Sequence, residues 1–115
     1  MRRFFYVESE EDVAEHGDLV HMSCQHFVRT RPWAGRLEVV DTRDSASTQI
    51  RMGLVYQGGH NEVARGELLG ILEFLSSFAR EHQITFAVGL EDEEVDIVSG
   101  LETTVTEIVD FLIEE

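Results

Sequence analysis

The stretch HMSCQHF, residues 21–27, contains residue types that ligate metal ions or attack substrates. Its Cys24 is the only cysteine of the chain, and His21 and His26 flank it. A structural zinc site needs four protein ligands, and a catalytic site needs three and a water. A reactive thiol needs neighbouring cations that lower its pKa, and so acidic a chain offers few of them. We therefore expect no metal ion at this stretch, and a buried Cys24 that packs as a small apolar side chain.

The element that carries this stretch decides which of its side chains share a face. Residues 18–30 alternate between two sets of side chains, and such alternation predicts a strand. In a strand, Met22, Cys24 and His26 would lie on the core side. His21 would then lie on the opposite side, so the stretch would not gather its histidines around the thiol.

The other elements follow from the spacing of apolar residues and from capping signals. Further strands are predicted over residues 2–8, 36–41, 48–57 and 84–90. Helices are predicted over about residues 10–16 after Ser9, over 61–82 after Asn61, and at the C-terminus after Ser99 with Glu102. Gly17 suits the position that ends the first helix. The sequence predicts one α+β domain over residues 1–115, in the order β(α)βββαβα. One long central helix and a C-terminal helix would cover a mostly antiparallel sheet of about five strands.

The charge of the chain is strongly negative and unevenly distributed. The net charge is −14, and every cation is an arginine. Residues 60–115 hold 14 Asp and Glu and two arginines, whereas residues 1–59 hold nine and seven. Such a surface repels phosphates, so we expect no direct nucleic-acid binding and favour a protein partner with a basic surface. Alternatively, the acidity reflects a high-salt host or GC-rich coding, and the protein is a structural homodimer.

The cysteine count and the apolar runs indicate where the protein resides. A single cysteine excludes an intrachain disulfide and is usual in a reducing compartment. No apolar run approaches the ~20 residues of a membrane span, and the N-terminus lacks the features of a signal peptide. The sequence therefore predicts a cytoplasmic protein without membrane contact.

Two stretches supply the candidate partner-binding residues. The loop RTRPWAGR concentrates Arg31, Trp33 and Arg36 around the only proline, and tryptophan and arginine dominate interface hot spots. Trp33 either lies exposed and marks a partner site or folds back as a lid on the core. The second stretch is an expected acidic turn over residues 91–96, with Glu91, Asp92, Glu93, Glu94 and Asp96.

These features favour a non-enzymatic protein-binding domain. In a sharper form, the protein is an inhibitor or immunity-type protein, of the kind that phages use against host defence. Its carboxylates would imitate nucleic-acid phosphates and cover the basic surface of a partner. No cofactor is expected in that function.

A glycine turn, QGGHNEVARGELL, supports an alternative function. Gly58, Gly59 and Asn61 lie between a predicted strand and a predicted helix, where backbone N–H groups bind anions. The segment resembles the pyrophosphate loop of the GNAT acetyltransferases, with Asn61, Ala64 and Gly66 at positions of that motif. The resemblance implies a small enzyme that binds acetyl-CoA at this turn.

A second resemblance is to RNase H. It rests on Asp41 at the end of a predicted strand, Glu67 in the long helix and Asp92 after the next strand. It implies three clustered carboxylates that support metal-dependent cleavage of a phosphodiester.

The long helix also contains two glycines on one stripe, Gly66 and Gly70. Each glycine costs a helix ~1 kcal/mol relative to alanine. The presence of two glycines therefore predicts that another backbone approaches this helix closely, either that of the C-terminal helix or that of a second subunit.

Overall fold

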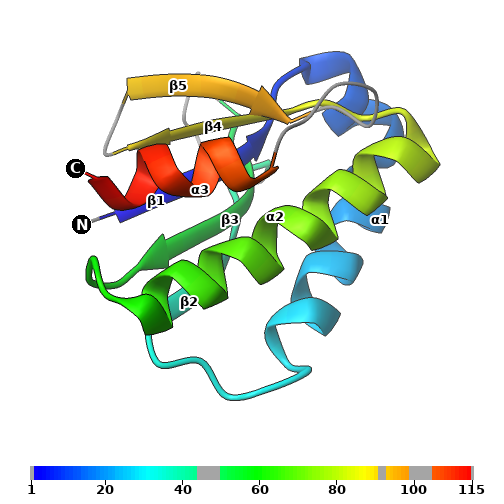
Figure 1. The fold of residues 1–115 in the computed structure, drawn as a ribbon. Coiled ribbons are helices and arrows are strands. Elements are labelled where there is room, and N and C mark those ends of the chain that lie inside the picture. Colours follow the sequence, from blue (N-terminus) through cyan, green and yellow to red (C-terminus); the bar gives the residue numbers. More distant parts are fainter. Residues whose placement is uncertain (1, 44–49, 91–92, 99–104, 115) are drawn as a thin grey trace.

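The computed structural model describes residues 2–43, 50–90, 93–98 and 105–114. Within them the elements are β1 (Arg2–Val7), α1 (Glu10–Val28), β2 (Arg36–Asp41), β3 (Met52–Gln57), α2 (Glu62–His82), β4 (Phe86–Leu90), β5 (Glu93–Val98) and α3 (Val105–Glu114) (Figure 1). The strands form one antiparallel sheet in the order β2-β3-β1-β4-β5. The α+β class expected from the sequence is confirmed.

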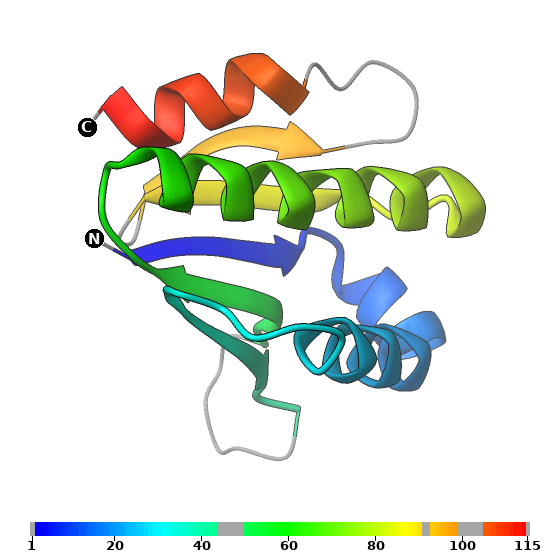
Figure 2. The same ribbon diagram turned by 60° about the horizontal axis from the view of Figure 1, so that its bottom comes forward.

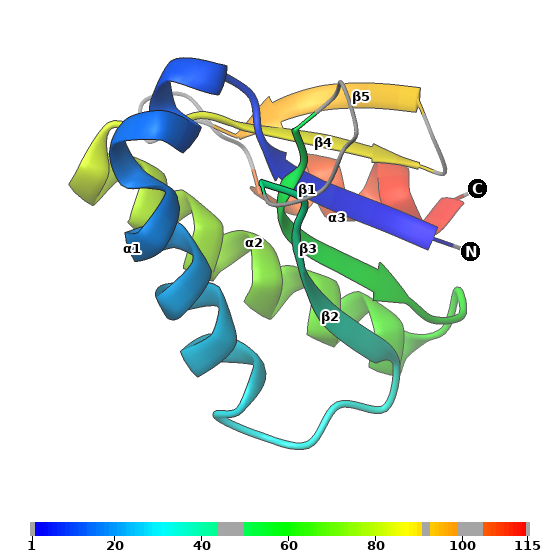
Figure 3. The same ribbon diagram turned by 180° about the vertical axis from the view of Figure 1, so that it is seen from behind.

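The sheet has its helices on one face. The elements from β1 to β4 follow the βαββαβ order of the split βαβ, or ferredoxin-like, arrangement, and β5 and α3 are added to it. All three helices contribute to one core that includes Phe5, Leu54 and Val88 from the central strands. The helices α2 and α3 lie in front of the strands in Figure 1 and behind them in Figure 3. Figure 2 shows α2 between α3 and α1.

Residues 10–28 form one continuous helix, so the strand predicted over residues 18–30 is wrong. The side chains that α1 buries recur at intervals of three and four residues: Val13, Gly17, Val20 and Cys24. This spacing is helical, and within it Val20 and Cys24 also fit the alternation of a strand. The predicted helix over residues 10–16 is therefore only the first part of α1.

The start of α1 is as predicted, but its end is not at Gly17. The Ser9 hydroxyl accepts a hydrogen bond from the backbone N–H of Asp12 at 3.4 Å, as an N-cap does. Gly17 is buried in the middle of the helix, and a Cβ there would lie 2.5 Å from Nη1 of Arg43. Arg43 is itself held by Asp18 and Asp41, each at 2.9 Å. The glycine therefore makes room for a guanidinium and does not terminate the helix.

The segment over residues 36–41 and the long helix agree with the predictions. The strand β2 has the expected bounds, and α2 begins directly after Asn61, whose side chain accepts a hydrogen bond from the N–H of Ala64 at 2.9 Å. The strand β3 begins at Met52, later than predicted, and residues 44–49 lie outside the described part. Ser99 and Glu102 also lie outside it. Among the described helices, none is long and apolar enough to cross a membrane.

The acidic turn predicted over residues 91–96 is corrected in part. Residues 93–98 form β5, an edge strand that pairs with β4. Charged residues on an edge strand oppose pairing with a strand from another molecule. Glu91 and Asp92 lie outside the described residues.

Candidate functional site

The side chains of HMSCQHF point in different directions around α1. Cys24 is buried as expected, and burial raises the pKa of its thiol to about 12. Met22 and His26, which a strand would have placed on the core side, are exposed. Nδ1 of His21 lies 2.9 Å from Oδ2 of Asp41, so this histidine links α1 to the end of β2. In the described part of the chain, no three His, Cys, Asp or Glu side chains lie close enough together to hold a metal ion.

The carboxylates of the RNase H resemblance are not gathered. Asp41 ends β2, where a hydrogen bond from Arg43 holds the carboxyl pKa below its usual value although partial burial opposes this. Glu67 instead binds the backbone N–H of Gly35, just before β2 begins. Asp41 and Glu67 therefore lie at opposite ends of this strand, and Asp92 is outside the described residues.

Glu67 is the centre of a hydrogen-bond network that joins α2 to the loop before β2. Its two carboxylate oxygens accept from the backbone N–H groups of Ala34 at 2.8 Å and Gly35 at 2.9 Å. One of them also accepts from the Tyr56 hydroxyl at 2.6 Å. Burial alone would raise the pKa of Glu67, but these hydrogen bonds and the charge of Arg31 lower it. The carboxylate is therefore ionised at neutral pH and holds the loop in place.

Tyr56 is fully buried, and its hydroxyl is a hydrogen-bond donor. Burial, followed by the hydrogen bond to Glu67, raises the pKa of the phenol well above its usual value. A Cβ at Gly35 would lie 2.5 Å from the Tyr56 ring, and one at Gly58 would lie 2.8 Å from it. These two glycines therefore let the backbone close over both sides of the ring.

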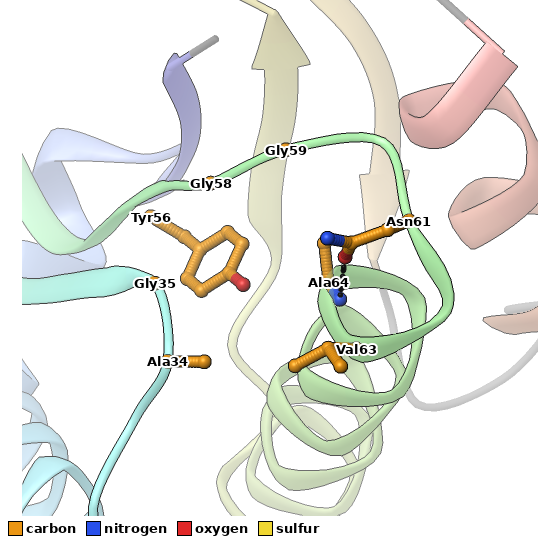
Figure 4. Close-up of a pocket in the computed structure, with 8 residues that line it drawn as sticks. All are labelled: Ala34, Gly35, Tyr56, Gly58, Gly59, Asn61, Val63 and Ala64. Atoms are coloured by element: carbon orange, nitrogen blue, oxygen red, sulfur yellow. Dashed lines mark hydrogen bonds between the residues drawn. The ribbon is translucent and has the colours of Figure 1, made fainter.

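A small pocket lies beside Tyr56 at the start of α2 (Figure 4). It is lined by Ala34, Gly35, Tyr56, Gly58, Gly59, Asn61, Val63 and Ala64. Its volume is about 90 Å³, whereas ligand pockets are usually ~300–1,000 Å³. The pocket is therefore too small to enclose acetyl-CoA, the ligand that the GNAT resemblance implies.

The carbonyl groups of the glycine turn are directed at Arg3. This arginine of β1 is fully buried on the core side, and it donates to the carbonyl oxygens of Gly58 at 3.0 Å and Gly59 at 2.8 Å. It also donates to the Leu112 carbonyl of α3 at 3.3 Å. An anion cradle depends on backbone N–H groups that point at the ligand. Here the turn offers its carbonyl oxygens to a guanidinium, which ties it to α3.

The predicted partner residue Trp33 covers part of the core. Its indole N–H donates to the Val28 carbonyl at 3.0 Å, and its ring lies 5.3 Å from that of Phe27. Phe27 in turn stacks on Phe74 of α2 at 4.2 Å. Trp33 is half-buried, so the structure favours the lid. Arg31 lies over the Trp33 ring, 4.3 Å from its centre.

The two candidate partner stretches lie at different edges of the sheet. Arg36 belongs to the edge strand β2, where it pairs with Glu38 at 2.7 Å. Glu93, Glu94 and Asp96 belong to the other edge strand, β5. The two stretches therefore do not form one continuous surface.

The structure brings together a set of carboxylates that the sequence interpretation did not select. The backbone N–H of Glu8 donates to the Thr85 carbonyl at 2.9 Å, so the start of α1 and the end of α2 lie at the same end of the domain (Figures 1 and 3). The carboxylates at this acidic end are Glu8, Glu10, Glu11, Glu15 and Glu81. All are exposed. Glu15 lies 3.7 Å from His16 and Glu81 lies 3.9 Å from His82, and none pairs with an arginine of the described residues.

The described chain is thus a two-layer α+β domain with a tight polar network at one end and exposed carboxylates at the other. Comparisons with protein-family models, with curated proteins and with solved structures find no match to this chain.

Proposed function

We propose that this protein is a non-enzymatic binding domain that engages a basic protein surface through its acidic end. The observation that carries the proposal is the group of exposed carboxylates at the start of α1 and the end of α2, none of which pairs with an arginine of the described residues. A partner that presents lysines and arginines would be attracted over a Debye length, about 10 Å at 0.1 M salt.

The other charged side chains support this assignment because several of them form ion pairs with one another within the fold. Arg43 bridges Asp18 and Asp41, and Arg65 pairs with Asp110 of α3. The carboxylates of the acidic end are left to contact a partner. A partner whose basic surface normally binds nucleic acid would be blocked by them, which is the inhibitor or immunity-type form of the proposal.

The alternative of an anionic cofactor at the Gly58–Gly59 turn has less support. The turn directs its carbonyl oxygens at Arg3, and the adjoining pocket holds only about 90 Å³. A thermal-shift screen with coenzyme A tests it, because a ligand at 100 times its Kd stabilises a protein by about 2.7 kcal/mol.

Two triple variants with equal charge change test the proposal. The test variant is E10Q/E11Q/E15Q, with two residues in the first turn of α1 and one further along. The control variant is E62Q/E73Q/E107Q, with residues in the first turns of α2 and α3 and one further along α2. All six side chains are exposed. The matched positions equalise the effect of each variant on helix dipoles and on net charge.

Each protein is immobilised and used to capture partners from a lysate of its source organism, at low and at high salt. We expect wild type and the control variant to retain the same protein at low salt, and the test variant to lose it. High salt should release the captured protein from both. Equal loss by the two triple variants would show that net charge acts without a local site, and would contradict the proposal.

A further inference from the structure

Two apolar side chains on the outer face of α1 lie beside the acidic end. Leu19 is 40% exposed and Met22 is 68% exposed, and the two lie one helical turn apart. The other exposed large apolar side chains of the described residues are Ile50, which precedes β3, and Val63, at the start of α2. The pair on α1 is therefore the only such pair on one helix face in the described part of the chain.

The position of these side chains follows from the helix geometry. The buried side of α1 carries Val13, Val20 and Cys24. Successive residues of a helix are rotated by 100°, which places Leu19 and Met22 on the opposite side, where they cannot pack in the core. Methionine is common on surfaces that bind varied partners because its side chain is unbranched and flexible.

The charges around the pair are all of one sign on this helix. Glu11 and Glu15 precede Leu19 at four-residue intervals, so they continue the same exposed stripe. The whole of α1 contains five carboxylates and no arginine or lysine, and one of the five, Asp18, is paired with Arg43. A surface complementary to this stripe must combine apolar side chains with cations.

We propose that the outer face of α1 docks an amphipathic basic helix of the partner protein. The apolar side of that helix packs on Leu19 and Met22, and its lysines or arginines contact Glu11 and Glu15. Two helices packed side by side lie 8–10 Å apart, which brings such groups within reach of one another. This inference rests on the proposed function and specifies the secondary structure and composition of the partner segment.

Two synthetic peptides test the inference. One places leucines along one side of a helix and lysines along the other, and the second has the same composition in a scrambled order. The protein variants are wild type, L19Q/M22Q, and V63Q as a control that removes an exposed apolar side chain elsewhere. Glutamine is a good helix former, so α1 should remain intact in the double variant. Circular dichroism checks this, and fluorescence anisotropy of labelled peptide gives each Kd.

We expect wild type and V63Q to bind the amphipathic peptide at least tenfold more tightly than the scrambled one, a difference of 1.4 kcal/mol. The L19Q/M22Q variant should lose this preference and retain its affinity for the scrambled peptide. Full preference in L19Q/M22Q would overturn the inference. The inference would also be overturned if sedimentation showed that wild type forms a dimer and that L19Q/M22Q is a monomer. The outer face of α1 would then bind a second copy of this chain.

The E10Q/E11Q/E15Q variant distinguishes failure of this inference from failure of the proposed function. If E10Q/E11Q/E15Q binds both peptides more weakly but Leu19 and Met22 have no effect, the proposed function stands and the docking face is wrong. If E10Q/E11Q/E15Q binds both peptides as wild type does, the proposed function fails as well.

Discussion

Replacing Tyr56 by phenylalanine removes one hydroxyl from the network around Glu67 and leaves the buried ring in place. That hydroxyl donates to an ionised carboxylate at 2.6 Å, while the N–H groups of Ala34 and Gly35 bind the same carboxylate. The variant therefore isolates one charge-assisted hydrogen bond. A matched control is Tyr6→Phe, because the Tyr6 ring is partly exposed and its hydroxyl makes no hydrogen bond to the described residues.

The expected loss can be estimated from the type of bond. A hydrogen bond to a charged group contributes about 1.5–3 kcal/mol to the free energy of unfolding. For a chain of 115 residues, an unfolding entropy of about 2.1 cal/mol/K per residue makes 1 kcal/mol equal to about 4 °C in Tm. Thermal unfolding at neutral pH should therefore show a Tm lower by about 6–12 °C for Tyr56→Phe, and nearly unchanged for Tyr6→Phe.

The difference should also depend on pH. The pKa of Glu67 is lower in the folded state than in the unfolded state. Its stabilising contribution is therefore complete above the unfolded-state value of about 4.3 and is lost as pH falls through the lower folded-state value. Urea unfolding at a series of pH values should show wild type and Tyr56→Phe converging below about pH 4. A Tyr56→Phe variant as stable as wild type at neutral pH, or a difference that grows on acidification, would refute this account of the network.

Three further substitutions test other contacts. Arg3→Met removes the hydrogen bonds that Arg3 donates to three carbonyl groups and should cost about 1–3 kcal/mol in urea unfolding. An unchanged midpoint would show that the guanidinium is dispensable. Gly53→Ala should be strongly destabilising in thermal unfolding, because Gly53 has φ 153° and a Cβ would collide with the Phe5 carbonyl; a normal Tm would contradict this. Gly66→Ala should stabilise by up to about 1 kcal/mol, because no atom lies within 4 Å of the added Cβ. Lower stability would instead indicate an unrecognised contact there.

The elements that the sequence predicted well are those whose local signals agree. In α2, the cap at Asn61 and the apolar positions all indicate one helix, and β2 has the expected bounds at 36–41. In α1 the signals conflicted, because the apolar residues near Cys24 fit both periods and Gly17 resembled a helix end. The reason for Gly17 lies in the β2–β3 connection, where Arg43 occupies the space that a side chain would need. Local patterns carry no information about such a contact.

The glycines of α2 also show that local sequence patterns do not reveal contacts between distant residues. At Gly70 an added Cβ would meet the guanidinium of Arg31, from the loop before β2, which is the end of an exposed side chain that can move aside. Gly66 has open space above it. The two glycines therefore do not mark the α3 interface, and a second subunit at Gly66 stays a prediction.

The candidate sites were predicted less well than the fold because they depend on residues that are distant in sequence. Glu67 reaches Tyr56 and the loop at Ala34 only after the sheet and α2 have packed. Glu10 and Glu81 come to the same end of the domain only because Glu8, after β1, is hydrogen-bonded to Thr85, before β4. The signal for part of the acidic end was present, since Ser9 caps a helix whose first turn is acidic. The sequence favoured the run at 91–96 because four of its charges, at residues 91–94, are consecutive.

The most direct test of binding through the acidic end is a titration of ¹⁵N-labelled protein with the amphipathic basic peptide, followed by NMR chemical shifts. The account predicts that the largest shifts occur in residues 8–22, with smaller changes near Glu81, and that they disappear in E10Q/E11Q/E15Q. Shifts concentrated at residues 31–36 or 58–61, or spread evenly over the domain, would contradict it.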